Sequence, residues 1–313
     1  MPAIDPRFHP LPGWRWGVFL NAEGMKLRYG WADPTVPLRA TVVTLPGFGG
    51  FAEQWFELFR DLLDRGLAVR HLDWRGQGGS QRYLKNTHKM HSAGYDKDVA
   101  DLQRFLNRAM RRDSTKPMFL LAHSMGAHLA LRYLHDHPGR FAGAFFTAPM
   151  LHLRRLGATS LRVVQLMNVL GFGERYVPGH RDWVFRPEYS VDMSNLSHDP
   201  VRYRIAQLYY RENPGLRIGG ATWRWLRETL RSTRVVNGEA YLRSITTPVL
   251  LATGGKDDHI DNIAVARAAR LLPNARLLPF PEAKHDLWLE TDAVRTALLD
   301  NLEAFLHEQT PVE

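Results

Sequence analysis

Apolar runs of strand length alternate with helix-period segments through most of this 313-residue chain. The strand-like runs are Ala40–Leu45, Leu67–Trp74, Pro117–Ala122, Phe141–Thr147, Pro248–Thr253 and Ala275–Phe280. The helix-period segments are Glu53–Arg65, Asp96–Arg112, Met125–His135, Asn262–Leu272 and Asp292–His307. This alternation predicts an α/β fold in which helices cover both faces of a mainly parallel sheet. A hairpin over Trp16–Leu20 and Met25–Trp31 is expected to open the chain.

The alternation stops between about Met150 and Thr246, where Arg, Trp, Tyr and Pro crowd short helical segments. This break predicts a helical insertion that caps the carboxyl edge of the sheet. The expected organisation is a core in two parts, residues 1–149 and 247–313, with the cap at 150–246. Prolines interrupt Met1–Trp31 and no apolar run reaches about 18 residues, so we expect no signal peptide, no membrane span and a cytoplasmic location.

Positive charge is concentrated in the predicted insertion. The whole chain carries a formal charge of +9, and the segment Leu151–Ile245 alone has 15 Arg, no Lys and 8 acidic residues, a balance of +7. Arginine favours bidentate contacts with phosphate or carboxylate. Two interpretations stay open: a solvated basic surface, or a surface that attracts an anionic lipid, substrate or membrane. Nucleic-acid binding is not predicted, because no aromatic and basic recognition motif accompanies the charge.

The segment Phe119–Ala127 runs from a buried strand directly into a helix, with small residues on both sides of Ser124. This is the pattern of a nucleophile elbow, a turn so sharp that bulky neighbours would collide. Ala122 stands where the pattern has its first Gly. The turn would aim the Met125 N–H at a reacting carbonyl and stabilise the oxyanion. The alternative is a serine that merely caps the helix.

A second oxyanion donor is expected from the loop Leu45–Gly50, with the Phe48 N–H as the candidate. The same loop has a rival interpretation as a dinucleotide fingerprint, because Gly47, Gly49 and Ala52 open a helix and Asp73 ends the next strand. A dinucleotide site would leave the elbow unexplained. We therefore expect no cofactor.

A nucleophilic serine needs a histidine base and an acid, which follow the elbow in the order Ser, Asp, His. The loop Thr253–Asp258 follows a strand and supplies Asp257 and Asp258, and Phe280–Asp286 follows the last strand and supplies His285. The sequence therefore predicts Ser124 as nucleophile, His285 as base and an aspartate that orients it.

No metal site is predicted. The chain has no Cys, which excludes disulfides and thiolate ligands. His135–His137 ends a helix, where cationic side chains suit the helix dipole. His88–His91 lacks a Glu at zinc-protease spacing. The loop Arg75–Ser80 lacks a phosphate-binding lysine and is interpreted as scaffold.

These residues resemble a known family, the α/β-hydrolases related to monoacylglycerol lipases and bacterial lysophospholipases. His123–Gly126 resembles the elbow of monoacylglycerol lipases, and Asp73–Gly78 resembles a strand-and-loop signature of the family. Asp257 with Asp261-Asn262 matches its acid motif, which implies that Asp257 rather than Asp258 is the triad acid. Pro46 departs from the family, since many relatives have His before the oxyanion-loop Gly.

Two segments of the insertion, Ser197–Tyr203 and Asn213–Gly220, resemble the cap of the bacterial lysophospholipase branch. The resemblance implies an α/β-hydrolase fold with a sheet of the eight-stranded type and a cap that roofs an acyl-chain pocket. Most of the apolar cap residues are nevertheless expected to form the cap's own core. They are Leu161, Val164, Met167, Val169, Leu170, Trp183, Phe185, Trp223 and Trp225.

The expected function is hydrolysis of single-chain acyl esters or lysolipids through an acyl-enzyme on Ser124. Two alternatives on the same fold stay open: an amide or peptide hydrolase of the aminopeptidase type, and a binding protein that turns over too slowly to matter. The first would need an acidic anchor for the substrate amine. Steady-state turnover would exclude the second.

Overall fold

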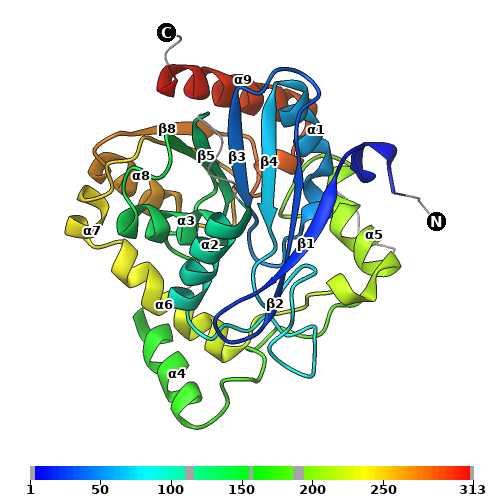
Figure 1. Ribbon diagram of the computed structural model, residues 1–313. Coiled ribbons are helices and arrows are strands. Elements are labelled where there is room, and N and C mark those ends of the chain that lie inside the picture. Colours follow the sequence, from blue (N-terminus) through cyan, green and yellow to red (C-terminus); the bar gives the residue numbers. More distant parts are fainter. Residues whose placement is uncertain (1–3, 110–115, 155–157, 186–193, 311–313) are drawn as a thin grey trace.

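A single sheet of eight strands forms the centre of the molecule in a computed structural model, which describes residues 4–109, 116–154, 158–185 and 194–310 (Figure 1). Its strand order is β1-β2-β4-β3-β5-β6-β7-β8. The strands are β1 Arg15–Leu20, β2 Lys26–Ala32, β3 Ala40–Leu45, β4 Leu67–Leu72, β5 Met118–His123, β6 Gly143–Thr147, β7 Val249–Gly254 and β8 Ala275–Phe280. The β1–β2 hairpin pairs antiparallel with β4, and all other neighbours are parallel.

Helices cover both faces of the sheet, and the strands are therefore apolar on both sides. The core helices are α1 Phe56–Asp64, α2 Tyr95–Ala109, α3 Met125–Asp136, α8 Asn262–Leu271 and α9 Asp292–Gln309. Leu121 of β5 belongs to the cluster that contains α1 and α9, whereas its neighbour Leu120 belongs to the cluster that contains α2, α3 and α8. This period of two in a fully buried strand explains why the sequence shows continuous apolar runs there.

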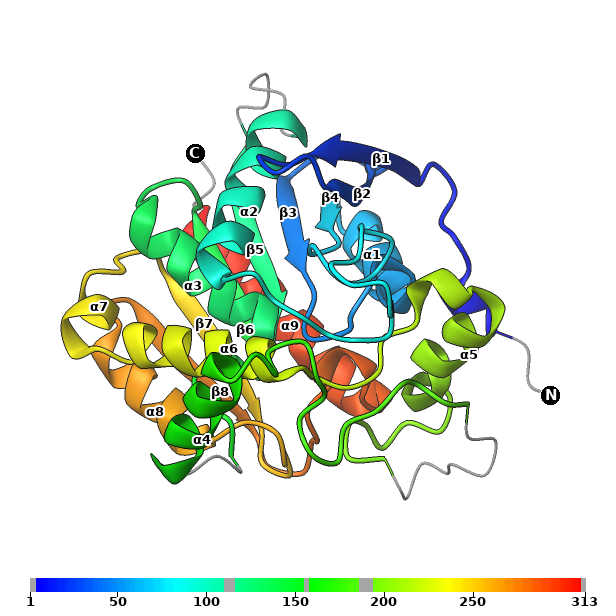
Figure 2. The same cartoon turned by 90° about the horizontal axis from the view of Figure 1, so that it is seen from below.

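The segment between β6 and β7 contains α4 Ala158–Val169, α5 Ile205–Glu212, α6 Trp223–Val236 and α7 Glu239–Arg243. The short 3₁₀ helices within the described ranges are η1 Pro6–Phe8, η2 Ala52–Trp55, η4 Arg202–Arg204, η5 Pro214–Leu216 and η6 Leu287–Leu289. Figure 2 shows α6 beside α3 and α4, with α5 apart from them on the side of α1. Buried hydrogen bonds join α6 to the core: Tyr95 to Thr229 at 2.8 Å and His128 to Ser232 at 2.7 Å.

The architecture confirms the predicted α/β-hydrolase fold, and the differences are local. The expected strand Leu67–Trp74 ends at Leu72, because the buried side chains of Asp73 and Trp74 bind neighbouring loops. The expected helix Glu53–Arg65 is split into η2 and α1. None of the helices within the described ranges has the length and apolar character needed to cross a membrane.

A buried ion cluster joins the antiparallel hairpin to the parallel part of the sheet. Arg28 of β2 lies 2.6 Å from the carboxylate of Asp73 and makes two 2.7 Å contacts with Glu53. Burial acts to raise the pKa of Asp73, but the Arg28 charge together with the hydrogen bonds from His71 and the Gly79 N–H outweighs it and holds this pKa at about 2. Asp73 also accepts hydrogen bonds from the N–H groups of Ala52 and Gly79. One ionised side chain therefore fixes three segments.

We predict that Asp73→Asn lowers the free energy of unfolding by about 3 kcal/mol, because it leaves the Arg28 charge buried and only partly paired. Urea unfolding at pH 7 measures this change. Asp33→Asn is a matched control: Asp33 also lies 2.6 Å from an arginine, Arg70, but its side chain is 56% exposed, so less than about 1 kcal/mol is expected.

The pH dependence provides a second check on this prediction. Since the pKa of Asp73 is lowered on folding, its contribution is complete above the unfolded value of 3.8 and is lost as the pH falls towards 2. The difference between the wild type and Asp73→Asn should therefore shrink below about pH 4. Equal destabilisation by the two Asp→Asn variants at pH 7 would contradict the assigned role of the cluster.

Candidate active site

The turn between β5 and α3 holds Ser124 in a strained backbone conformation. Its φ of 51° and ψ of −115° are rare for a residue with a side chain. The turn is possible because Gly126 lies against the loop after β3, where a Cβ at this position would be 2.4 Å from the Leu45 carbonyl oxygen. Ala122 is completely buried in the strand and is accommodated. The geometry is that of a nucleophile elbow rather than of an ordinary helix cap, since the Ser124 side chain caps no helix N–H.

Ser124, His285 and Asp257 form one hydrogen-bonded chain. His285 Nε2 lies 3.1 Å from Ser124 Oγ, and His285 Nδ1 lies 2.6 Å from Asp257 Oδ2. With the proton on Nδ1 donated to Asp257, Nε2 is free to accept the Ser124 hydroxyl proton. The structure thus brings together the three residues that the sequence selected.

The aspartate beside His285 is Asp257 and not Asp258. Asp257 is 1% exposed, and its other oxygen accepts hydrogen bonds from the N–H groups of His259 and Ile260. The Asp258 carboxylate is half exposed and lies 3.3 Å from Arg154. This arrangement agrees with the register that the family resemblance implies.

The charges in the site favour an ionised acid and a basic histidine. Burial acts to lower the pKa of His285, but the hydrogen bond and charge of Asp257 outweigh it, so this pKa is raised. Burial acts to raise the pKa of Asp257, but the hydrogen bond and charge of His285 together with two backbone N–H groups outweigh it, so that pKa is lowered. His285 can therefore take a proton from Ser124 while Asp257 remains charged.

The loop after β3 places backbone N–H groups beside Ser124. Gln77, completely buried, donates to the carbonyl oxygens of Gly47 and Gly50 at 2.8 and 3.0 Å and accepts from the Gly49 N–H at 3.1 Å. Tyr210 of α5 donates to the Gly49 carbonyl at 2.9 Å. These contacts confirm that Arg75–Ser80 is scaffold.

The two predicted oxyanion donors remain available in this loop and at the elbow. Within the described ranges, the N–H groups of Phe48 and Met125 have no hydrogen-bond acceptor. The Phe48 side chain points away from the loop and packs edge-on against Trp225 of α6, with ring centroids 4.9 Å apart. The N–H groups are thus free to bind a negative oxygen, while the side chain links the loop to the inserted segment.

Neither a dinucleotide nor a metal fits these residues well. In the dinucleotide interpretation the Asp73 carboxylate would bind a ribose. Its oxygens are already bound by Arg28 and by two backbone N–H groups. His123, His285 and Asp286 are close enough to form a cation cluster, with ligand atoms within 4.8 Å of one another. Their polar atoms are already engaged with Thr147, Asp257, Ser124 and each other.

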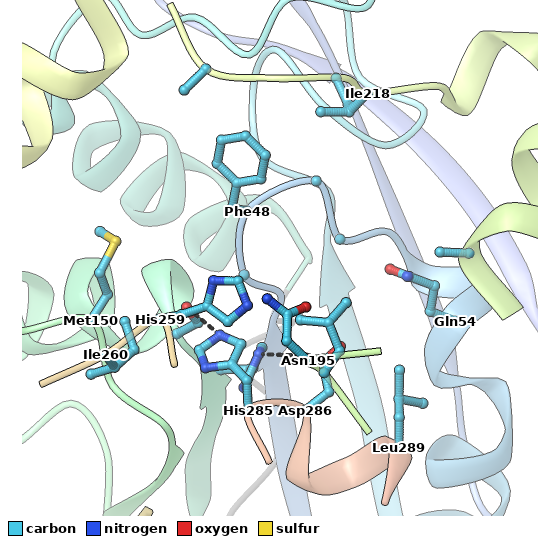
Figure 3. A pocket seen from close by; sticks show the side chains of 18 of the residues that line it. Phe48, Gln54, Met150, Asn195, Ile218, His259, Ile260, His285, Asp286 and Leu289 are labelled. Atoms are coloured by element: carbon cyan, nitrogen blue, oxygen red, sulfur yellow. Dashed lines mark hydrogen bonds and ion pairs between the residues drawn. The ribbon is translucent and has the colours of Figure 1, made fainter. Parts of the chain in front are cut away.

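A cavity of about 700 Å³ opens above Ser124, and its wall is mainly apolar. Figure 3 shows it extending to both sides of His285, towards Met150 and Ile260 on one side and towards Gln54 and Leu289 on the other. No Lys or Arg of the described ranges lines it. Burial lowers the pKa of the lining residues His180 and His259, so both are neutral at pH 7. The basic charge of the insertion is therefore outside the cavity.

Few of the apolar residues singled out in the insertion reach this cavity. Trp183 and Trp225 line it, whereas Val164 and Trp223 are buried in the core. Val169 and Leu170 point to solvent, with exposures of 84% and 57%. Trp225 also belongs to the core, and Met167 and Trp183 pack against it, so five of the nine residues are internal, although the core they join includes the α/β body and is not confined to the insertion.

Several residues of the site were not singled out from the sequence. His123 and Asp286 form a second imidazole–carboxylate pair, with Nε2 and Oδ1 2.9 Å apart. His259 lies against the His285 ring, with centroids 4.9 Å apart. The first two are direct neighbours of Ser124 and His285, and that adjacency is the signal that would have identified them.

Comparison with known proteins gives the same picture. The chain is 29% identical to a probable lysophospholipase L2 of Haemophilus influenzae over 89% of this chain and 87% of the relative. It is 28% identical to the human monoglyceride lipase over 93% and 90% of the two chains. A soluble variant of the monoglyceride lipase of Saccharomyces cerevisiae, solved with a substrate analogue, superposes with a TM-score of 0.76 at 19% identity, covering 100% and 99% of the two chains.

The family model described as serine aminopeptidase, S33, matches residues 36–292, which include β3 to β8, Ser124, Asp257 and His285. The predicted family is thereby confirmed at the level of sequence as well as of fold. The chain belongs to the serine aminopeptidase S33 family of hydrolases.

Proposed function

We propose that this protein hydrolyses carboxylic esters of single-chain lipids, through an acyl-enzyme on Ser124. The observation that carries the proposal is the Ser124–His285–Asp257 chain, placed at the floor of a largely apolar cavity. The relatives named lysophospholipase and monoglyceride lipase support the substrate class.

The geometry assigns a step to each group. His285 Nε2 takes the proton of Ser124 Oγ as the oxygen attacks the ester carbonyl, and Asp257 stabilises the resulting imidazolium. The N–H groups of Phe48 and Met125 bind the oxyanion. His285 then gives its proton to the leaving alcohol, and the same groups activate water to release the acid.

We also propose that residues 150–246 act as a cap that limits access to Ser124. Side chains of this segment, including Trp183, Tyr210 and Trp225, form much of the cavity wall. A cavity of about 700 Å³ suits one flexible acyl chain better than two. The described cavity wall carries no Lys or Arg. The basic surface would therefore attract a phosphate-bearing substrate only as it approaches the protein, and this attraction would change KM rather than kcat.

A substrate panel tests the proposed reaction. It contains p-nitrophenyl esters, a monoacylglycerol, lysophosphatidylcholine, lysophosphatidylglycerol, a two-chain phospholipid and aminoacyl amides. Steady-state turnover of the single-chain esters is expected. Preference for the aminoacyl amides would instead support a peptidase, in which Asp258, an exposed acid of the cavity wall, anchors the amine. Labelling of Ser124 without turnover would support a binding protein.

We predict that Ser124→Ala and His285→Ala each lower kcat about 10³-fold or more, because each removes a group that transfers the proton or attacks the ester. Asp257→Asn should lower kcat about 10²- to 10⁴-fold by disturbing the orientation and tautomer of His285. The measurement is steady-state hydrolysis of a p-nitrophenyl ester, with circular dichroism to check folding.

Asp258→Asn is the matched control for Asp257→Asn. The two residues are neighbours on one loop, but only Asp257 touches His285, so Asp258→Asn should keep kcat within about threefold of the wild type. A severe loss on Asp258→Asn with a mild loss on Asp257→Asn would show that the assignment of the acid is wrong. More than about a tenth of wild-type kcat in Ser124→Ala would reject Ser124 as the nucleophile.

We further propose that α4 makes peripheral contact with an anionic membrane. Val163, Leu166, Val169 and Leu170 are more than half exposed and follow one another at nearly helical spacing. Figure 1 shows α4 projecting from the body of the molecule. Arg162 is the one charged residue in the sequence between Leu161 and Leu170, so this surface suits the interface of a bilayer. The expected cytoplasmic location, with contact at the inner face of the membrane, stays a prediction.

Leu166→Asp combined with Val169→Asp should abolish sedimentation with phosphatidylglycerol vesicles, because two carboxylates would have to enter the bilayer interface. Turnover of a dissolved short-chain ester should not change. Val18→Asp combined with Leu20→Asp is the matched control, since these β1 residues are similarly exposed at 56% and 58%. Vesicle binding that survives the α4 substitutions would reject this contact.

A further inference from the structure

A second imidazole–carboxylate pair lies directly beside the Ser124–His285 pair. His123 precedes Ser124 at the end of β5, and Asp286 follows His285 after β8. His123 Nε2 is 2.9 Å from Asp286 Oδ1, and His123 Nδ1 is 3.0 Å from the hydroxyl of Thr147. The two backbone segments that carry Ser124 and His285 are therefore joined by two side-chain contacts in parallel.

Nothing in the fold requires this pair to be polar. A buried imidazole and a carboxylate that is only 21% exposed lose much of their hydration, and an apolar pair of similar volume could stabilise the chain equally well. His123 is 9% exposed, and its ring meets the His285 ring edge-on with centroids 4.8 Å apart. Asp286 is also tied to the inserted segment, because its N–H donates to the Leu196 carbonyl at 2.8 Å. The pair is thus held rigidly against His285.

We propose that Asp286 is a positioning residue: a second carboxylate, anchored by His123, that stabilises the imidazolium form of His285 together with Asp257. The inference rests on the proposed function of His285 as the base. Asp286 has no direct hydrogen bond to His285 among the described contacts, so it acts through its charge and through the placement of the His285 loop. His123 is needed because an unpartnered carboxylate at this position would take up a proton.

The charges around His285 agree with this role. The groups that face it are Asp257 and His259 from the loop after β7, His123 from the end of β5 and Asp286 itself. Burial acts to raise the pKa of Asp286, but the His123 hydrogen bond together with the charges of His123, His285 and His259 outweighs it and lowers this pKa, so the carboxylate is ionised. Its charge in turn helps to raise the pKa of His285, after the larger effects of burial and Asp257.

The sign of the effect on activity follows from the base mechanism. His285 must be neutral to take the Ser124 proton, so the rate falls as the pH drops through the His285 pKa. Removing the Asp286 charge lowers the His285 pKa. The acid limb of the pH–rate profile, which is the fall in rate at low pH, therefore moves to lower pH. Removing the charge also weakens stabilisation of the imidazolium, so the plateau rate falls. If Asp286 only held the His285 loop in place, its removal would lower the plateau rate without moving the acid limb.

The test is the pH dependence of the second-order reaction of Ser124 with a fluorophosphonate, together with kcat and KM for a p-nitrophenyl ester. Asp286→Asn keeps the size of the side chain and an acceptor for His123. It should move the acid limb down by about half a pH unit or more and lower the plateau about tenfold, with KM changed by less than about threefold. Asp286→Glu, which restores the charge, should return the limb towards the wild-type pH.

Two further variants distinguish this role from general effects of charge or folding. Asp258→Asn removes another carboxylate of the cavity wall and should leave the acid limb in place. His123→Phe keeps a ring against His285 but leaves Asp286 without its partner. Adding Asp286→Asn to His123→Phe should therefore cost less than about twofold more. Completeness of fluorophosphonate labelling gives the amount of folded protein in each sample.

An acid limb that stays in place in Asp286→Asn, or moves to higher pH, overturns the inference. So does an equal shift in Asp258→Asn. A wild type that reacts with the fluorophosphonate but turns over no ester rejects the proposed function and leaves the positioning role measurable by the labelling rate. A wild type that does not react at all rejects both, because Ser124 is then not activated.

Discussion

The contact between Gly126 and the loop after β3 is the constraint on which the rest of the site depends. An added methyl at Gly126 would lie 2.4 and 2.5 Å from the carbonyl oxygens of Leu45 and Pro46. Only with Gly at this position can the start of α3 approach the loop and bring the Met125 N–H to the same side as the Phe48 N–H. The strained backbone of Ser124 is held by this packing and by the Ser124 N–H bond to Thr147.

Polar side chains buried beneath the site keep its loops rigid. Gln77 occupies three backbone groups of the oxyanion loop, and Asp73 fixes the next turn while it balances Arg28. Tyr210 adds a contact from the inserted segment to the Gly49 carbonyl. Because each of these groups is nearly or fully buried and satisfied, the loops can present their N–H groups without reorganising when charge develops on a substrate oxygen.

The fold and the principal residues of the site could be predicted because their signals are local. Alternating apolar runs gave the parallel sheet, and small residues around Ser124 gave the elbow. The partners of Gln77, Arg28 and His123 could not be predicted, since these residues pair with groups 25 to 163 positions away, which meet only once the strands are in register. The apolar spacing of α4 also does not indicate whether its side chains face a core or solvent. Val169 belongs to this apolar pattern and is nevertheless 84% exposed.

The described arginines of this basic protein lie outside the cavity above Ser124. The cavity can therefore hold a neutral ester through apolar contacts, without an ion pair to the substrate. Several arginines of the insertion form ion pairs, as Arg202 does with Glu57, Asp199 and Asp292. The acids Asp258 and Asp286 line the cavity, and burial lowers the pKa of two of its histidines, His180 and His259. Net negative charge beside His285 favours the imidazolium that forms during reaction, and it disfavours a carboxylate product that stays in the cavity. In the proposed mechanism, the charges that stabilise the His285 imidazolium would therefore also favour release of the acid.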